Sequence, residues 1–388
     1  MVDPLRVLMV SPQFRPMVGG YEQAGERLAA ELVRRGHRVT VVTERRDPAW
    51  PPREDIQGIR IRRLTSWNRP KLQTVSGIFF LALFLLSHAR RFDVIHVHQY
   101  GWCSTVAIIL GRMLGRPVVL KLTSTGPQGI VATLNLLHGT GFHVRLHRRL
   151  SACIATSERA RKEVIELGLV ADRVHLIPNG LDTRAFVPAL GGARSDARRQ
   201  LGLGDEPLAI TVCHIRPEKN LPMLLDAWKR VQTLLPAARL IIVGDGPGMT
   251  DLKDRVERLG LQGAVLLPGA YPDPRPWYAV ADLFVLSSAN EGLSNSLMEA
   301  LSSGLPMVST RVSGSEDVIA AADIGLLVPL DDAQALGEAA AEILGSPERA
   351  LKCGVRAREY AEANYSLTAV ADKVEALYRL LISSGRAA

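Results

Sequence analysis

The segment NEGLSNSLMEALSSGLP, residues 290–306, follows the apolar run Leu283–Leu286, which predicts a buried parallel strand. A short helix should begin near Leu297 and end at the glycine and proline that close the segment. The strand then leads to a helix N-terminus at the carboxyl edge of a sheet, where open α/β proteins bind ligands. The dipole and the N–H groups of that turn favour an anion. The candidate ligand-binding residues here are Leu293, Ser294, Asn295 and Ser296.

Two glutamates frame this turn. Glu291 lies in the loop before the helix, and we expect Glu299 in the first helical turn. A carboxylate can accept hydrogen bonds from two hydroxyl groups at once, so the arrangement suits a ligand with both phosphate and sugar parts. Alternatively, Glu299 only complements the helix dipole and Glu291 is a solvated loop residue, since acidic residues are common in first turns.

The spacing from Glu291 to Glu299 and the following ALSSGLPMV resemble the signature of retaining nucleotide-sugar glycosyltransferases of the GT-B fold, family four. The resemblance implies an α/β chain with two Rossmann-like doubly wound domains that face a cleft, and a C-terminal helix that crosses back to the first domain. It also implies that Glu291 lies near the donor sugar, as a catalytic residue, and that Glu299 binds the ribose of the nucleotide.

A chain of 388 residues suits two domains of near-equal size. Of the 47 Lys and Arg residues and 39 Asp and Glu residues, 27 and 14 precede residue 188, so the excess positive charge lies in the first half. This asymmetry indicates an anionic partner or surface, and no nucleic-acid-binding motif is present. The expected parts are an acceptor-binding domain (1–187), a linker (188–199), a donor-binding domain (200–366) and the returning helix (367–388).

Neither a metal nor a cofactor is expected. The chain has no Asp-x-Asp motif of the kind that holds a metal on a diphosphate, and Asp331-Asp332 reads as a helix cap. The resemblance implies that a nucleotide-sugar, a UDP- or GDP-sugar, is a substrate and not a cofactor. The four cysteines form no CxxC pair and the N-terminus leads straight into a strand, so we expect a cytoplasmic protein with reduced thiols and no signal peptide.

In the first domain, the strand LRVLMV leads to Gly19-Gly20, where a phosphate can approach the backbone closely. The pattern is not the dinucleotide fingerprint GxGxxG. The resemblance implies that this GGxE turn lies against the donor diphosphate and sugar, although Glu22 is equally an ordinary helix residue. Many family members also have a histidine near the sugar where this chain has Thr123.

His96 and His98 share one side of the strand FDVIHVHQY. An HxH pair can bind zinc, but no further ligands have convincing spacing, and histidines that serve the structure are the commoner alternative. His98 is the candidate catalytic residue because it lies nearer the end of the strand.

In the second domain, the strand PLAITV leads to His214, Arg216 and Lys219. The resemblance places an arginine and a lysine of this region on the diphosphate, because cations stabilise the charge that grows on the leaving group. Aligned on Lys219, the arginine position falls on His214, and Arg216 is a possible substitute. Lys219 and Arg216 are therefore candidate catalytic residues. The remaining candidates are donor-binding residues in two turns, Gly244 in GDGPG and Gly269 and Tyr271, which the family uses to recognise the base.

The run Ile78–Leu86, IFFLALFLL, is shorter than the roughly 20 residues that span a bilayer. It reads either as a core helix or as a helix exposed to a membrane surface. Flanking basic residues can attract anionic lipid, so we hypothesise that the first domain docks peripherally on the inner membrane face and that the acceptor is a sugar or lipid-linked sugar of polysaccharide or glycolipid synthesis. These residues are Arg60, Arg62, Arg63, Arg69, Lys71, Arg90, Arg91, Arg145, Arg148 and Arg149.

Two alternatives remain from the sequence alone: a nucleotide-sugar epimerase of similar two-domain fold, and a sugar- or nucleotide-binding protein without turnover. The match of EGLSNSLMEALSSG argues against the epimerase. Release of nucleoside diphosphate from a donor would distinguish an enzyme from a binding protein.

Overall fold

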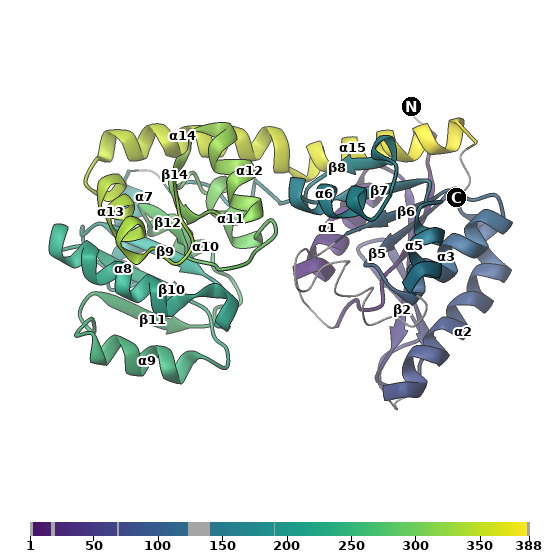
Figure 1. Ribbon diagram of the computed structural model, residues 1–388, viewed down its shortest axis with the longest axis horizontal. Helices are drawn as coiled ribbons and strands as arrows, with labels where there is room; N and C mark the ends of the chain where they lie inside the picture. Colours follow the sequence, from purple (N-terminus) through teal and green to yellow (C-terminus); the bar gives the residue numbers. More distant parts are fainter. Residues whose placement is uncertain (1–2, 17–19, 68–69, 123–139, 190, 386–388) are drawn as a thin grey trace. The chain divides into compact units, whose positions relative to one another are not determined.

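The computed structural model of the protein divides into two units. The first contains Met1–Gly180 and Leu367–Ala388, and the second contains Leu181–Ser366. Each unit is a mostly parallel sheet between layers of helices (Figure 1), which confirms the predicted pair of Rossmann-like domains. The described residues are 3–16, 20–67, 70–122, 140–189 and 191–385.

The sheet of the first unit has the order β3-β4-β2-β1-β5-β6-β7-β8, and only the β3–β4 pair is antiparallel. The chain order reverses between β1 and β5, so the carboxyl ends of these two strands form a switch point, the usual ligand position in such sheets. The bounds are β1 Arg6–Val10, β2 Arg38–Arg45, β3 Arg53–Ile56, β4 Ile59–Thr65, β5 Val94–His98, β6 Val118–Lys121, β7 Ala152–Ala155 and β8 Val174–Leu176.

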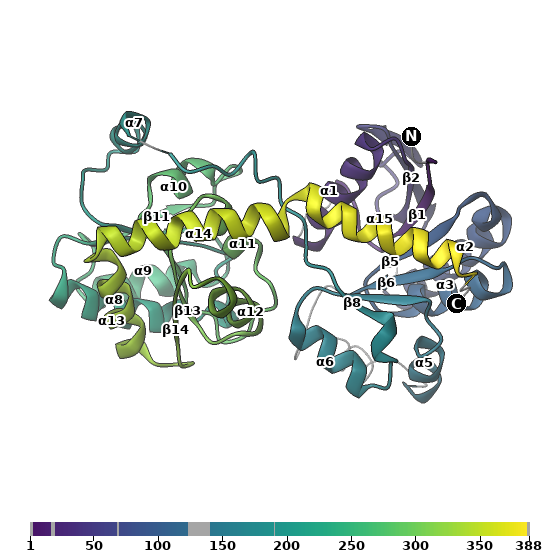
Figure 2. The same cartoon turned by 90° about the horizontal axis from the view of Figure 1, so that it is seen from above.

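Helices cover both faces of this sheet, and every residue of the central strands β5 and β6 is buried. One face packs against α1 and α15, which lie side by side (Figure 2), and the other packs against α2, α3, α5 and α6. The bounds are α1 Gly20–Arg34, α2 Pro70–His88, η1 Ala89–Arg91, α3 Trp102–Met113, α5 Thr140–His147, α6 Glu158–Glu166, η3 Ala171–Arg173 and α15 Leu367–Ser383.

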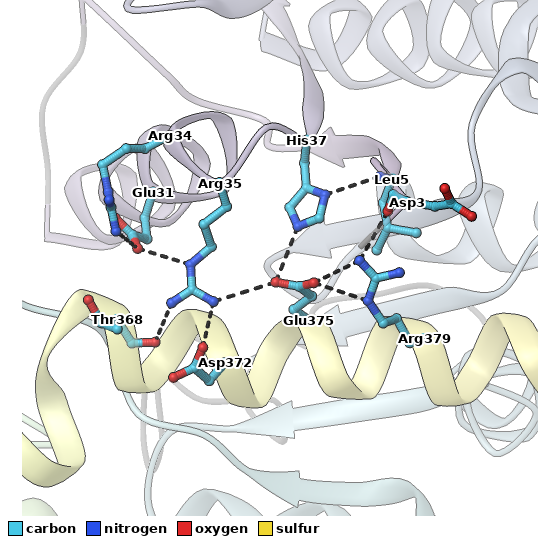
Figure 3. Close-up of polar contacts among 10 residues, drawn as sticks. All are labelled: Asp3, Leu5, Glu31, Arg34, Arg35, His37, Thr368, Asp372, Glu375 and Arg379. Atoms are coloured by element: carbon cyan, nitrogen blue, oxygen red, sulfur yellow. Dashed lines mark hydrogen bonds and ion pairs between the residues drawn. The ribbon is translucent and has the colours of Figure 1, made fainter. Parts of the chain in front are cut away.

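The C-terminal helix α15 is held in the first unit by apolar burial and by a polar network (Figure 3). Arg35, directly after α1, binds Asp372 at 2.6 Å and donates to the Thr368 carbonyl at 2.8 Å. His37 bridges two segments, since Nδ1 accepts from the Leu5 N–H at 3.1 Å and Nε2 lies 3.2 Å from Glu375. The predicted return of the last helix to the first domain is therefore confirmed.

The sheet of the second unit has the order β11-β10-β9-β12-β13-β14, all parallel. This is the Rossmann order, with its switch point between β9 and β12. The strand predicted from Leu283–Leu286 is confirmed as β12. The other bounds are β9 Leu208–Val212, β10 Arg239–Val243, β11 Val265–Gly269, β13 Met307–Thr310 and β14 Gly325–Val328.

One face of the second sheet packs against α8, α9 and α13, and the other against α7, α10, α11, α12 and α14. The bounds are α7 Gly192–Gln200, η4 Pro217–Lys219, α8 Leu221–Leu234, α9 Met249–Arg258, α10 Arg275–Val280, α11 Asn295–Ser302, α12 Ser313–Ala322, α13 Ala333–Leu344 and α14 Pro347–Tyr365.

The structure differs from the sequence-based expectation in the predicted linker, residues 188–199. Its second half forms α7, which belongs to the second unit. Arg198 on α7 is buried, donates to the Val280 carbonyl at 2.9 Å and pairs with Asp282 at 2.7 Å. The small and polar composition suggested a linker because the distant carboxylate that fixes this helix is not visible in the local sequence.

Candidate active site

At the switch point of the second unit, the loops after β9 and β12 are joined by an ion pair. Lys219, at the end of η4, binds the Glu291 carboxylate through Nζ. The Ser287 hydroxyl donates to the Lys219 carbonyl at 2.8 Å, and the Ser288 hydroxyl donates to Glu291 at 3.4 Å. Both charged side chains keep 17–19% of their surface exposed, so they remain accessible to a ligand.

Glycine is required where the loop after β10 approaches the loop after β9. A Cβ on Gly244 would lie 1.8 Å from the Cys213 carbonyl oxygen, and Gly244 has a φ of +147°. A Cβ on Gly246 would lie 2.4 Å from the Ile215 carbonyl oxygen. These contacts let the two loops run side by side, and the Ile215 N–H donates to the Asp245 carbonyl at 2.9 Å. Gly244 therefore shapes the edge of the site.

Glu299 lies on α11 and is 9% exposed. The Tyr278 hydroxyl donates to Glu299 Oε2 at 3.1 Å. Burial, reinforced by the negative charge of Glu299, raises the pKa of Tyr278 well above its ordinary value, so the phenol keeps its proton and remains a donor. The hydrogen bond fixes the orientation of the carboxylate at the carboxyl edge of the sheet.

The start of α11 differs from the expectation by two residues. The helix begins at Asn295 rather than near Leu297, so Glu299 is its fifth residue and the first turn contains no acidic side chain. Glu299 therefore does not serve simply as a first-turn partner of the dipole. Ser294 occupies the N-cap, but its hydroxyl bonds to the Ser296 hydroxyl at 2.9 Å instead of capping the backbone. The positive end of the dipole lies beside the loop that carries Glu291.

The structure does not group all of the predicted basic residues. His214 and Arg216 are exposed, and neither forms an ion pair with any residue in the described ranges. Arg216 lines a pocket of about 450 Å³ together with Arg255 and Arg258, and Lys219 is absent from the described lining of that pocket. Lys219 is thus paired with Glu291, whereas Arg216 faces a separate depression.

The turn after β11 carries the residues predicted to recognise the base. Gly269 ends β11 with a φ of +87°, and its carbonyl accepts from the Gly244 N–H at 2.9 Å. Tyr271 follows with 45% of its surface exposed, and its ring packs edge-on against Trp277 at 5.2 Å. An exposed aromatic ring held by a second ring can stack against a base.

In the first unit, His98 ends β5 at the switch point. It is buried and stacks on His96 at 4.3 Å, while His96 bonds through Nδ1 to the Tyr378 hydroxyl at 2.5 Å. Burial, with a contribution from Lys121, lowers the pKa of His98 to about 3, so the imidazole is neutral near pH 7. Burial also lowers the pKa of Lys121 to about 8. His98 Nε2 has no hydrogen-bond partner among the described residues.

The remaining first-domain candidates are only partly described. Gly20 is the first residue of α1, whereas Gly19 and Thr123 lie outside the described residues. Glu22, in the first turn of α1, is buried. Across the described ranges, no group of three or more His, Cys, Asp or Glu side chains could hold a metal ion. Asp332 caps α13 by accepting from the Ala335 N–H at 2.8 Å, as the sequence predicted.

Sequence reasoning missed three kinds of residue near the site. Tyr278 was not considered, because it precedes Glu299 by 21 positions and the local sequence does not show the contact. Ser287 and Ser288 directly follow β12, and polar residues at the end of a buried strand are a signal that could have identified them. Gly314 was also missed, although a Cβ there would lie 2.3 Å from the Gly292 carbonyl and disturb the loop before α11.

Comparisons with known proteins show the family of the chain. The family model for Glycosyltransferase Family 4 matches residues 18–185, and that for Glycosyl transferases group 1 matches residues 193–360. Sulfoquinovosyl transferase SQD2 of Arabidopsis thaliana is 30% identical over 323 residues, which are 81% of this chain and 61% of that protein. The GDP-mannose-dependent alpha-(1-6)-phosphatidylinositol monomannoside mannosyltransferase of Mycolicibacterium smegmatis is 26% identical, and the match covers 92% of this chain and 94% of that protein.

Among solved structures, Anabaena HepE in complex with UDP superposes with a TM-score of 0.79 at 21% identity, covering 97% of this chain and 100% of that one. At this level of identity the likeness shows the fold. The two family matches cover both units of the structure. The chain therefore belongs to glycosyltransferase family 4 and has the GT-B fold.

Proposed function

We propose that the protein transfers a glycosyl group from a UDP- or GDP-sugar to an acceptor hydroxyl, with retention of the anomeric configuration. The observation that carries this proposal is the Lys219–Glu291 pair beside the positive end of α11, with Glu299 oriented by Tyr278. Together they offer a cation, a helix dipole and a fixed carboxylate, which suit the diphosphate and ribose of a nucleotide. The relatives, named as a sulfoquinovosyl transferase and a mannosyltransferase, support a transferase and give no support to an epimerase.

In this proposal each charged group has a separate task. Glu299 accepts the ribose hydroxyls, and Lys219 exchanges part of its interaction with Glu291 for the donor diphosphate. As the bond between the sugar C1 and the phosphate oxygen breaks, Lys219 and the α11 N-terminus stabilise the negative charge that develops. The acceptor oxygen bonds to C1 on the same face, and its proton passes to the departing phosphate oxygen.

The proposal assigns acceptor binding to the first unit. Gly19 and Gly20 keep their expected role near the donor diphosphate, and His98 remains a candidate catalytic residue at the end of β5. With its pKa lowered to about 3, His98 would act as a neutral hydrogen-bonding group, since it would not carry a proton to donate as an imidazolium near pH 7.

A screen of UDP-, GDP- and ADP-sugars by thermal shift, followed by product analysis, tests the proposal. We expect one class of donor to raise the Tm, to release nucleoside diphosphate and to give a product whose anomeric configuration matches the donor. Stabilisation without release would indicate a binding protein, and an inverted product would contradict the assignment of retention.

Activity should survive excess chelator. Lys219 and the α11 dipole supply the positive charge that a divalent ion supplies in other transferases, and hard cations require clustered oxygen ligands. The check is an initial-rate assay with and without EDTA, after passage of the protein over a chelating resin. Complete loss on chelation and rescue by Mn²⁺ would contradict this expectation.

We further propose that the first unit attaches to an anionic membrane surface through α2. Leu81 and Leu85 pack in the core. The opposite side of α2 carries a stripe of apolar residues, each with 42–61% of its surface exposed. Length and apolar composition alone would let Leu72–Arg91 cross a membrane, but core helices meet the same criterion. α2 is therefore apolar on both its buried and its exposed side. The exposed apolar side would be stabilised by contact with another apolar surface, such as the interior edge of a membrane. The stripe consists of Leu72, Val75, Phe79, Leu83 and Leu86.

Flotation with liposomes tests this attachment. Wild-type protein should float with anionic vesicles at low salt and less at high salt, because basic side chains near a surface contribute about 1 kcal/mol each and are screened. Phe79→Ser with Leu83→Ser should reduce flotation several-fold. Leu351→Ser with Val355→Ser is the matched control, since these α14 residues are similarly exposed in the second unit. Equal flotation of both double variants would remove α2 from the contact.

A further inference from the structure

A second pocket lies in the first unit, between the sheet and the C-terminal end of α2. Its volume is about 680 Å³, within the usual range of ligand pockets. The pocket is formed by the amino ends of β1 and β2, the β3–β4 hairpin and η1. Seven arginines line it, and no carboxylate belongs to its described lining. We refer to it as the arginine pocket.

Most of these arginines have no charged partner. Arg6 pairs with Asp93 and Arg63 with Glu54, each at 2.6 Å, so the structure itself neutralises two of the seven. The other five form no ion pair with any residue that the structure describes. An excess of five positive charges therefore surrounds one pocket. These residues are Arg38, Arg53, Arg60, Arg62 and Arg91.

The β3–β4 hairpin places two of these charges against each other. Arg53 lies directly opposite Arg62 in the antiparallel ladder, and like charges in that position destabilise a sheet. Asp55 lies opposite Arg60, but it accepts from the Gly58 N–H at 2.9 Å and forms no ion pair with Arg60. Burial and the positive charges of its two arginine neighbours lower the pKa of Arg62. Neither Arg53 nor Arg62 forms an ion pair with a residue that the structure describes.

We propose that the arginine pocket is a binding site for a phosphate-bearing anion with at least two negative charges. Guanidinium groups from separate strands and from η1 can surround the several oxygens of such a group, and arginine matches phosphate geometry better than a point charge does. Phe84 and Phe92 supply apolar walls for the part of the ligand that carries the phosphate. A bound anion would remove the repulsion between Arg53 and Arg62.

This site is separate from the proposed donor site. The arginine pocket includes the amino ends of β1 and β2. The donor candidate Gly20 begins α1, after the carboxyl end of β1, His98 lies at the carboxyl end of β5, and the donor candidates from His214 to Glu299 belong to the second unit. The inference therefore does not rest on the proposed function. The phosphate can belong to a lipid headgroup, since α2 carries both the apolar stripe and part of the pocket wall, or to a soluble anion.

Titration with inorganic pyrophosphate by calorimetry tests the site. The Arg53→Gln/Arg62→Gln variant should bind pyrophosphate at least 10-fold more weakly than wild type. Arg112→Gln/Arg145→Gln is the matched control, because it removes the same charge from exposed positions of the first unit that lie outside the pocket; its affinity should stay within 2-fold. The nucleotide-sugar concentration that gives half-maximal turnover should be unchanged in both, which separates this test from that of the donor site.

Two further measurements complete the design. Without anion, the pocket variant should have a Tm no lower than wild type, because it loses a repulsion, and pyrophosphate should raise the Tm of wild type only. Binding to vesicles of phosphatidic acid and of phosphatidylglycerol, matched in total charge, distinguishes a lipid headgroup from a soluble anion. If the phosphate belongs to a lipid, wild type and the control variant should prefer phosphatidic acid, and the pocket variant should lose this preference. If wild type has no such preference, the ligand is a soluble anion. Equal weakening of pyrophosphate binding in both variants, or none in the pocket variant, would overturn the proposal.

Discussion

Lys219→Ala is expected to lower kcat by about 100-fold or more, because removal of one group that stabilises charge in the transition state typically costs 100- to 1,000-fold. The substitution also leaves Glu291 without its ion-pair partner at the proposed position of the donor sugar. A carboxylate without a cation would repel the diphosphate, so donor affinity should fall as well. Initial rates at saturating donor measure the effect on kcat separately from the effect on binding.

Two companion variants make this result specific. Arg216→Ala should have a smaller effect, because Arg216 lines a separate pocket and forms no ion pair with a described residue. Lys229→Ala removes the same charge from an exposed position on α8 and should leave kcat unchanged. A larger loss in Arg216→Ala than in Lys219→Ala would assign the diphosphate to the Arg216 pocket instead.

Glu299→Ala should weaken donor binding by about 1–3 kcal/mol, because the ribose hydroxyls lose a charged acceptor in a largely buried position. This corresponds to about 5- to 150-fold in Kd. Calorimetric titration with the preferred donor gives the value, and the thermal unfolding profile shows whether the fold is intact. Unchanged affinity in a folded variant would remove Glu299 from the ribose site.

Tyr278→Phe tests how Glu299 is oriented. The ring and its packing remain, but the hydrogen bond at 3.1 Å is lost. If the phenol positions the carboxylate, the donor affinity of Tyr278→Phe should lie between those of wild type and Glu299→Ala. The double variant should then bind the donor no more weakly than Glu299→Ala alone. Additive losses would mean that the two residues contact the donor independently.

The local sequence was sufficient to predict β12, because a run of four apolar residues between polar neighbours is too short for a buried helix and typical of a strand that is buried on both faces. It also predicted that a ligand-binding turn follows β12. The start of α11 was placed two residues late, because Ser294 and Ser296 are both residue types that commonly cap helices, and the structure has Ser294 at the N-cap. Propensity identifies such elements, but it does not specify hydrogen-bond partners.

Features that depend on distant contacts could not be predicted in this way. α7 forms because Arg194 and Arg198 bind Asp282, which lies more than 80 residues away. The sequence left α2 as either a core helix or a surface helix, and the structure shows one buried side and one exposed side. The arginine pocket likewise depends on the pairing of β3 with β4, which places Arg53 opposite Arg62.

The release of nucleoside diphosphate from the preferred nucleotide-sugar, measured side by side for wild type, Lys219→Ala and Glu299→Ala, tests the central claim most directly. The claim is that the switch point between β9 and β12 binds the donor and stabilises its leaving group. We predict that wild type releases nucleoside diphosphate and that Lys219→Ala loses turnover even at saturating donor. Glu299→Ala should need a higher donor concentration to reach half of its maximal rate. Absence of release with every donor, or equal release by all three proteins, would contradict it.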